Sequence, residues 1–180
     1  MITISYLEIF ALITVLWIFS RAYVWKKNKN TEVKPALRNE LKLLMFYICL
    51  IVLARIVYFP WHHINGHIGT LNFDCNRVFP PRLNLVPFVH LFDYYSGWKM
   101  NIIGNILMFI PVGIVLPACF KRLDSFLNTF LAGAMISLFI EISQLLFYER
   151  CSDVDDFIMN SAGAALGALA YFGIKKIRRH

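Results

Sequence analysis

Acidic and amide residues recur at helical spacing just after Arg150, and this stretch is the part of the chain best suited to chemistry. Ser152 is followed three residues later by Asp155, a capping-box spacing that predicts the start of a helix. The residues that share one stripe of that helix are Asp153, Asp156, Asn160, Gly163 and Gly167. The remaining faces are apolar, so within a membrane the stripe needs polar partners. Alternatively, the acids only complement the positive end of the helix dipole.

Two further apolar runs carry paired polar residues on single helix faces. Asn101 and Asn105 are four residues apart, and Glu141 and Gln144 are three apart. Such residues are functional candidates, because polar groups inside a membrane span are unfavourable unless they have partners. The alternative is that they only join helices through interhelical hydrogen bonds, at about 0.6 kcal/mol each.

Three carboxylates are candidates for a catalytic role. Asp153, Asp156 and Glu141 could act as general acid and base, or hold a divalent cation over a lipid phosphate. Glu141 could instead be the buried ion-pair partner of Arg55 or Arg150. In either case we expect Glu141 to face the interior of a helix bundle rather than lipid.

The overall composition is that of a membrane protein. The chain has 180 residues, 58% of them hydrophobic, and a net charge of +7. The basic residues lie between long apolar runs, which does not favour nucleic acid as a partner. The four cysteines show no metal-ligand spacing, so we expect no metal and no cofactor. Cys75 and Cys151 both fall in predicted outer loops and could form a disulfide.

Apolar runs long enough to cross a bilayer cover residues 4–25, 43–61, 100–120, 126–148 and 157–174. They predict an all-α fold, a polytopic transmembrane helical bundle of about five spans that forms one membrane domain over residues 1–180. A basic linker at 26–42 and a mixed loop at 62–99 separate the spans. Within that loop, residues 85–92 are too few to span and are broken by Pro87, which predicts an interfacial or re-entrant segment. Pro111 should kink the third span.

The basic residues divide between the two sides of the predicted bundle. One side carries thirteen: Arg21, Lys26, Lys27, Lys29, Lys34, Arg38, Lys42, Lys121, Arg122, Lys175, Lys176, Arg178 and Arg179. The other carries four: Arg77, Arg82, Lys99 and Arg150. The positive-inside rule therefore predicts an outside N-terminus and a cytoplasmic C-terminus, and the charge distribution is that of an inner-membrane protein. Residues 26–42 would be cytoplasmic, and residues 62–99 extracytoplasmic.

This topology collects the polar residues at the outer ends of the spans. The candidate ligand-binding residues are Arg82, Asn84, Asn101, Asn105, Glu141, Gln144, Arg150, Asp153, Asp156 and Asn160. The arginines would meet phosphate or carboxylate, and the amides would hydrogen-bond a head group.

The order of these motifs resembles the VanZ-like family. The matching patterns are Asn84-Leu-Val-Pro87-Phe88, Asn101-x3-Asn105-x3-Phe109-x-Pro111-x-Gly113, Glu141-x2-Gln144 and Arg150-x2-Asp153-x2-Asp156-x3-Asn160-x2-Gly163-x3-Gly167. The resemblance covers residues 82–170 and extends to the first two spans in layout only. It implies a small polytopic bacterial membrane protein from a family whose founding member is tied to low-level resistance to the glycopeptide teicoplanin. It does not imply a reaction.

Three functions follow as hypotheses. The first is a protein that binds or modulates a cell-envelope lipid, a lipid-linked precursor or a lipoglycopeptide at an outward-facing polar pocket. The second is an enzyme, although the sequence holds no G-x-S-x-G or H-E-x-x-H motif. The third is a small transporter subunit, against which the absence of inverted repeats weighs. The oligomeric state is left open, a homo-oligomer included.

Overall fold

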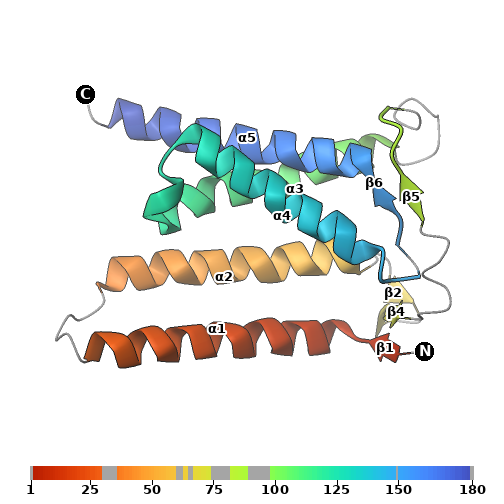
Figure 1. Ribbon diagram of the computed structural model, residues 1–180, viewed down its shortest axis with the longest axis horizontal. Coiled ribbons are helices and arrows are strands. Elements are labelled where there is room, and N and C mark those ends of the chain that lie inside the picture. The colour runs from red at the N-terminus through yellow and green to blue at the C-terminus, as the bar shows by residue number, and fades with distance from the viewer. Residues whose placement is uncertain are drawn as a thin grey trace. The chain divides into compact units, whose positions relative to one another are not determined.

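The computed structural model describes residues 2–29, 36–59, 63–64, 67–73, 82–88, 98–148 and 150–178. Five of its helices are long and apolar enough to cross a membrane, which confirms the all-α prediction of about five spans. The helices are α1 (Tyr6–Lys29), α2 (Leu37–Tyr58), α3 (Trp98–Cys119), α4 (Phe126–Gln144) and α5 (Val154–Ile177), with a short 3-10 helix, η1 (Lys121–Leu123) (Figure 1). The orientation of the termini in a membrane stays a prediction.

Short strands accompany the helices. They are β1 (Ile2–Ile4), β2 (His63–Ile64), β3 (His67–Ile68), β4 (Leu71–Phe73), β5 (Leu83–Asn84) and β6 (Ser152–Asp153). β2 and β3 pair antiparallel, whereas β5 and β6 pair parallel. The β5–β6 pair is the one that bears on function, because it lies directly before α5.

The chain divides into two compact units, residues 2–71 and residues 72–180. In the first unit, α1 and α2 meet through polar and aromatic contacts. The hydroxyls of Thr14 and Tyr47 are 2.8 Å apart, and the rings of Trp17 and Tyr47 lie 5.0 Å apart. Arg21 pairs with Glu40. The basic linker predicted for residues 26–42 is shorter than expected, because α1 continues through Lys29 and α2 already begins at Leu37.

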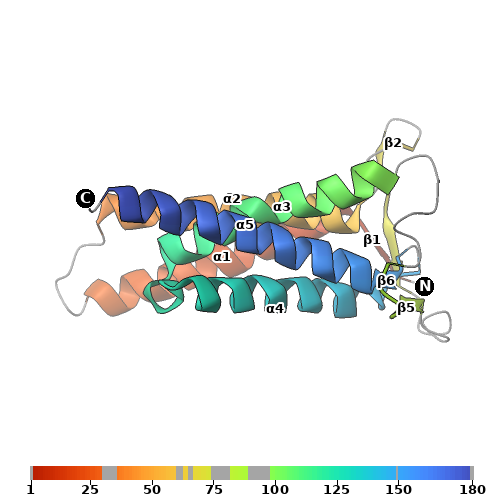
Figure 2. The same cartoon turned by 90° about the horizontal axis from the view of Figure 1, so that it is seen from above.

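In the second unit, α5 packs against both α3 and α4 (Figures 1 and 2). Glycines make the α3–α5 contact close. A Cβ added at Gly163 would overlap the carbonyl oxygen of Ile106, and one added at Gly167 would overlap that of Ile110. The glycine end of the predicted stripe therefore does let another backbone approach, as its spacing indicated.

The prolines of α3 do not interrupt it. Pro111 and Pro117 both lie inside the helix, which runs without a break to Cys119. Pro111 is exposed on the helix surface. Pro117 leaves its carbonyl oxygen within 3.5 Å of the Tyr171 hydroxyl on α5.

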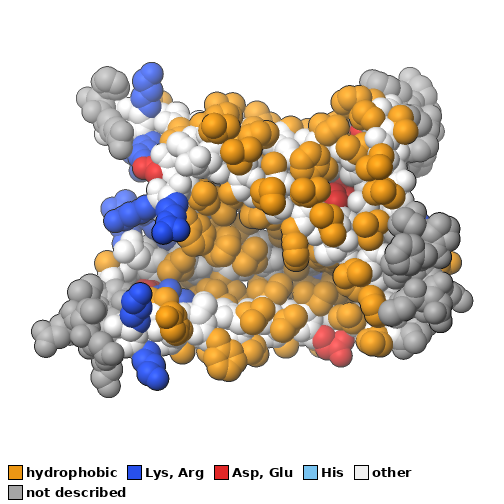
Figure 3. All heavy atoms as spheres, in the orientation of Figure 1, with side chains coloured by type: hydrophobic (Ala, Val, Ile, Leu, Met, Phe, Trp, Pro, Cys, Tyr) orange, Lys and Arg blue, Asp and Glu red, His pale blue; other side chains and the backbone are white. Residues whose placement is uncertain are grey.

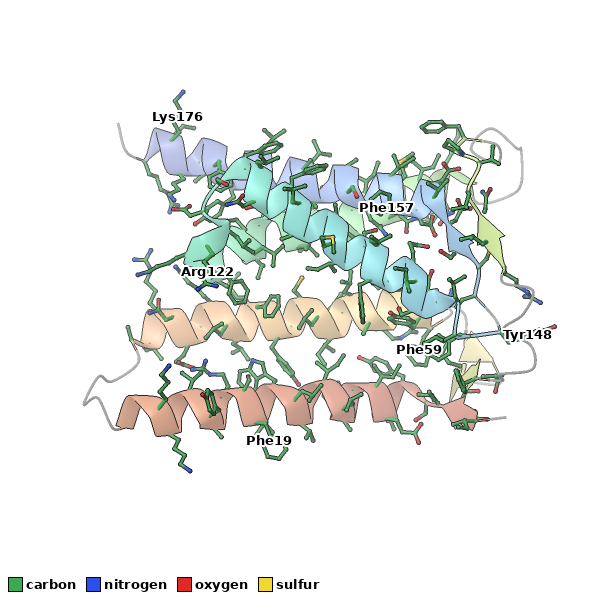
Figure 4. The ribbon with its side chains drawn as sticks, viewed as in Figure 1. Phe19, Phe59, Arg122, Tyr148, Phe157 and Lys176 are labelled. Carbon is green, nitrogen blue, oxygen red and sulfur yellow. The ribbon has the colours of Figure 1, made fainter. Side chains whose placement is uncertain are left out.

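Charge separates the two ends of the second unit. Figure 3 shows hydrophobic side chains over the flanks of the helices and Lys and Arg side chains gathered mainly at one end of each unit. In Figure 4, Arg122 and Lys176 lie at one end of the α3–α5 unit and Tyr148 lies at the other. Lys175 forms an ion pair with Asp124 at the basic end. The polar residues at the start of α5, which are predicted to bind a ligand, lie at the Tyr148 end.

Candidate functional site

The start of α5 is capped by Asp153 rather than by Ser152. Asp153 has extended backbone angles, and its Oδ1 accepts a hydrogen bond from the Asp155 amide at 2.9 Å. The capping-box prediction was wrong by one residue, because the Asp153 side chain, and not that of Ser152, accepts the free amide at the helix start. Asp153 therefore precedes the helical stripe and uses one carboxylate oxygen to satisfy a helix-end amide.

The β5–β6 pair brings a distant segment to this helix start. Leu83 aligns with Ser152, and Asn84 aligns with Asp153. The Ser152 amide donates to the Arg82 carbonyl oxygen at 3.0 Å. The Asn84 side chain donates to Asp153 Oδ1 at 3.1 Å. The predicted site residues Asn84 and Asp153 are thus in direct contact.

Asp155 takes part in the same arrangement, and the sequence reasoning did not include it among the site residues. Its side chain accepts the Phe88 amide at 2.9 Å, and the residue is only 8% exposed. Phe88 has a positive φ of 66°, and the turn before it is closed by the Val86 amide donating to Asn84 Oδ1 at 3.2 Å. No signal in the residue types near Asp155 points to this contact, because its partner is a backbone amide 67 residues away in the sequence.

Glu141 faces the interior, as predicted, with 5% of the residue exposed. Its Oε2 accepts a hydrogen bond from the backbone amide of Asp153 at 3.0 Å. An ion pair with Arg55 or Arg150 stays a prediction. Arg55 belongs to the other unit, where it donates to the Phe59 carbonyl oxygen at 3.2 Å. A carboxylate suits the start of α5, because amides there have no partner within the helix.

Asp156 meets α3. The Asn105 side chain donates to its Oδ1, which brings together two of the predicted site residues. Asp156 also experiences the charges of Asp153 and Arg150. Asn101, one turn earlier on α3, is exposed.

Asn160 and Gln144 are buried more deeply in the helix contacts. Asn160 is 2% exposed and donates to the Ser137 hydroxyl on α4 at 3.1 Å. Within the described part of the chain, its Oδ1 accepts no hydrogen bond. Gln144 is 6% exposed at the end of α4. Asn160 thus joins α5 to α4 through a hydrogen bond and gives this residue of the stripe the polar partner that a membrane interior requires.

Arg82 lies at the exposed edge of the site. Its guanidinium donates to the Tyr148 carbonyl oxygen at 2.9 Å and lies 4.4 Å from the centre of the Tyr148 ring. These contacts fix the base of β5 against the segment that follows α4. A guanidinium has five N–H groups, so this geometry is compatible with an anion at the same side chain.

Cys151, next to these residues, carries a thiol that donates to the Ser152 carbonyl oxygen at 3.7 Å. Partial burial raises the pKa of this thiol, the charge of Asp153 raises it further, and Arg82 opposes the shift. Cys75, its predicted disulfide partner, lies outside the described residues.

Polar groups from three parts of the second unit thus converge on the start of α5. We call this set the carboxylate cluster: Asn84, Asn105, Glu141, Asp153, Asp155 and Asp156. Each of its four carboxylates accepts a hydrogen bond from a backbone or side-chain amide. Within the described residues, no three of the Asp, Glu, Cys and His side chains form a group that could hold a metal ion.

The comparisons with known proteins agree with the motif order. A family model described as VanZ/LLP1 matches residues 44–176. Protein VanZ of Enterococcus faecium is 36% identical over 89 residues, which cover 49% of this chain and 52% of that protein. The chain thus spans about half the length of this curated relative. No solved structure matches the chain significantly. The extent of the family match shows that this chain, with its five candidate membrane-spanning helices, belongs to the VanZ/LLP1 family.

Proposed function

We propose that the chain is a multi-pass protein of the bacterial plasma membrane that binds a cell-envelope molecule at the carboxylate cluster. The molecule would be an envelope lipid, a lipid-linked precursor or a lipoglycopeptide. The observation that carries this proposal is the convergence of buried and half-buried carboxylates and amides from β5, α3, α4 and α5 at one end of otherwise apolar helices.

The position of the cluster suits such a ligand. It lies at the end of α3, α4 and α5 opposite to the basic residues of η1 and the α5 C-terminus (Figure 4). Cytoplasmic ends of membrane helices are enriched in Lys and Arg, so the cluster would face the extracytoplasmic side. A molecule of the outer leaflet would reach it without crossing the membrane.

The charges near the cluster suggest how the ligand is recognised. Arg82 is exposed at the edge, and Arg150 is half-buried and interacts with the charge of Asp156. The two arginines would meet a phosphate or carboxylate group of the ligand. The carboxylate of Asp156 would orient Arg150, and Asn84 and Asn105 would contribute amide hydrogen bonds.

The test is mass spectrometry of the lipids that co-purify with the protein in detergent. We expect wild type to retain an anionic envelope lipid or precursor that the Arg150→Ala variant loses. Lys176→Ala is the matched control, since it removes an exposed positive charge at the opposite end of the unit. Identical lipid profiles for all three proteins would contradict the proposal.

Family membership also motivates a proposed role in glycopeptide resistance. A host that expresses the chain should tolerate more teicoplanin than a host with the empty vector. Resistance is a more specific claim than lipid binding. If the host shows no increase in teicoplanin tolerance, the resistance role is wrong, and lipid binding is then judged by the mass spectrometry alone.

A membrane enzyme is the second candidate, and one observation favours it. Glu141, Asp153 and Asp156 lie close enough for Asp153 to hydrogen-bond Glu141 through its backbone amide and to act on Asp156 through its charge. Such a group could move protons to and from a lipid head group as general acid and base. Turnover of a lipid head group by the purified wild type, lost in both Asp153→Asn and Asp156→Asn, would favour the enzyme over the binding protein.

A further inference from the structure

The segment from Leu83 to Phe88 exposes apolar side chains although it is firmly attached to the protein. Leu85 is 67% exposed, Val86 58% and Phe88 49%. Pro87 between them is exposed as well. An exposed apolar patch of neighbouring side chains usually marks an interaction surface.

Hydrogen bonds hold this segment in one conformation. Its first part is a strand paired with β6, and its turn is closed by Asn84. Its last described residue, Phe88, is held at a positive φ by the bond from its amide to Asp155. A bulky side chain at positive φ is strained, so the surrounding bonds must hold Phe88 in place. The apolar side chains are therefore presented by an ordered support.

The segment lies where a membrane surface would be. It is attached to the first residues of α5, which is one of the candidate spans, and α5 continues from there as an apolar helix. Leu146, just after α4 at the same end, is 46% exposed, and Met100 near the start of α3 is 76% exposed. Apolar side chains are thus exposed on the segment and also on the neighbouring helices at the same end of the unit.

We propose that Leu83–Phe88 is an interfacial anchor that docks into the phospholipids of the leaflet at the Tyr148 end of the helices. Leu85, Val86 and Phe88 enter the boundary between head groups and acyl chains. Arg82, exposed at the base of the segment, remains at the phosphate level, as long basic side chains do at membrane interfaces. The proposal depends on the membrane location of the chain and not on the ligand proposed above.

This anchor would set the depth of the carboxylate cluster. Asn84 and Phe88, within the anchor, are bonded to Asp153 and Asp155. The start of α5 is therefore held at the level of the lipid head groups. That is the level at which a head group of the outer leaflet could be met.

Spin labels in proteoliposomes of phosphatidylethanolamine and phosphatidylglycerol test the anchor. A nitroxide is attached to Val86→Cys in a protein whose native cysteines are replaced by alanine. The controls are Leu131→Cys, which is exposed within α4, and Lys176→Cys, which is exposed at the basic end. We expect the ratio of collisions with oxygen to collisions with a water-soluble nickel complex to fall between those of the two controls.

Each other result overturns the proposal. A ratio equal to that at position 176 would place the segment in water, and a ratio as high as at position 131 would make it re-entrant. Low collision rates with both reagents would show that protein covers it. As a second measurement without cysteine replacement, a benzophenone side chain at position 88 in otherwise wild-type protein should cross-link to phospholipid, and labelling of protein alone would contradict the anchor.

The attachment to the cluster is tested in the same spin-labelled protein. Asp155→Ala removes the acceptor of the Phe88 amide and should increase the mobility of the label at position 86. Asp155→Asn retains an acceptor oxygen and should leave the mobility near that of the parent protein. If the mobility of the label in Asp155→Ala equals that in the parent protein, Asp155 does not hold the anchor.

Discussion

The α3–α5 contact should be sensitive to a single added methyl group. In Gly163→Ala the new Cβ would overlap the Ile106 carbonyl oxygen and lie 3.0 Å from Phe109 Cβ. The overlapped atom belongs to a helix backbone, so it can yield only if the two helices separate. Overpacking of this kind is unfavourable by about 1–3 kcal/mol. Alanine has a better helix propensity than glycine, which offsets this loss of stability by at most about 1 kcal/mol. We therefore expect a net loss of stability of about 1–2 kcal/mol.

Gly173→Ala is the matched control, because Gly173 is in the same helix and a Cβ there would meet nothing within 4 Å. The assay is thermal unfolding in detergent, followed by far-ultraviolet circular dichroism. Gly163→Ala should unfold at a lower temperature than wild type, and Gly173→Ala at the same or a higher temperature. Equal stability of the two variants would refute the close packing of α3 against α5.

The remaining predictions concern topology, the thiol and the buried acid. In a protein whose native cysteines are replaced by alanine, a membrane-impermeant maleimide added to intact cells should label a His67→Cys variant and spare Arg178→Cys; the reverse pattern would overturn the predicted orientation. Because the pKa of Cys151 is raised, its thiolate fraction at a given pH is low, and its alkylation rate should keep rising with pH beyond the ordinary pKa of a thiol. Asp153→Asn removes a negative charge and should shift that profile to lower pH, which alkylation kinetics in a Cys75→Ser background would measure. Glu141→Ala should destabilise the protein by about 1–3 kcal/mol, because it leaves the Asp153 amide unsatisfied, while Glu141→Gln keeps an acceptor and should lose less in the same thermal assay.

The spans were predictable from the sequence because the signal is local. A run of apolar residues of bilayer length predicts a helix without knowledge of its neighbours, and all five runs correspond to helices. The interior position of Glu141 followed in the same way, since an isolated carboxylate in a span needs a polar partner.

The partners themselves were less predictable because they are distant in sequence. The cap of α5 was misplaced by one residue because Ser152 and Asp153 are both residue types that cap helices, and the pairing of these two residues with β5 is invisible in the sequence near the helix. From the sequence, Asp155 was assigned only to the helix start, as part of the capping pattern or as a complement of the helix dipole, because its partner, the backbone amide of Phe88, is distant in the sequence. Every residue except proline has a backbone amide, so residue type does not show which amide a carboxylate will bind. The amides that bind Asp155 and Glu141 could therefore not be predicted.

The Asp153→Asn/Asp156→Asn double variant tests the central claim most directly. Asparagine keeps the oxygens that accept the hydrogen bonds of Asn84, Asn105 and the Asp155 amide, but it removes both charges. We expect normal expression, membrane insertion and thermal stability. Quantitative mass spectrometry of the purified variant should show that the envelope molecule retained by wild type is lost. Retention of that molecule at the wild-type level would contradict the carboxylate cluster as the functional site.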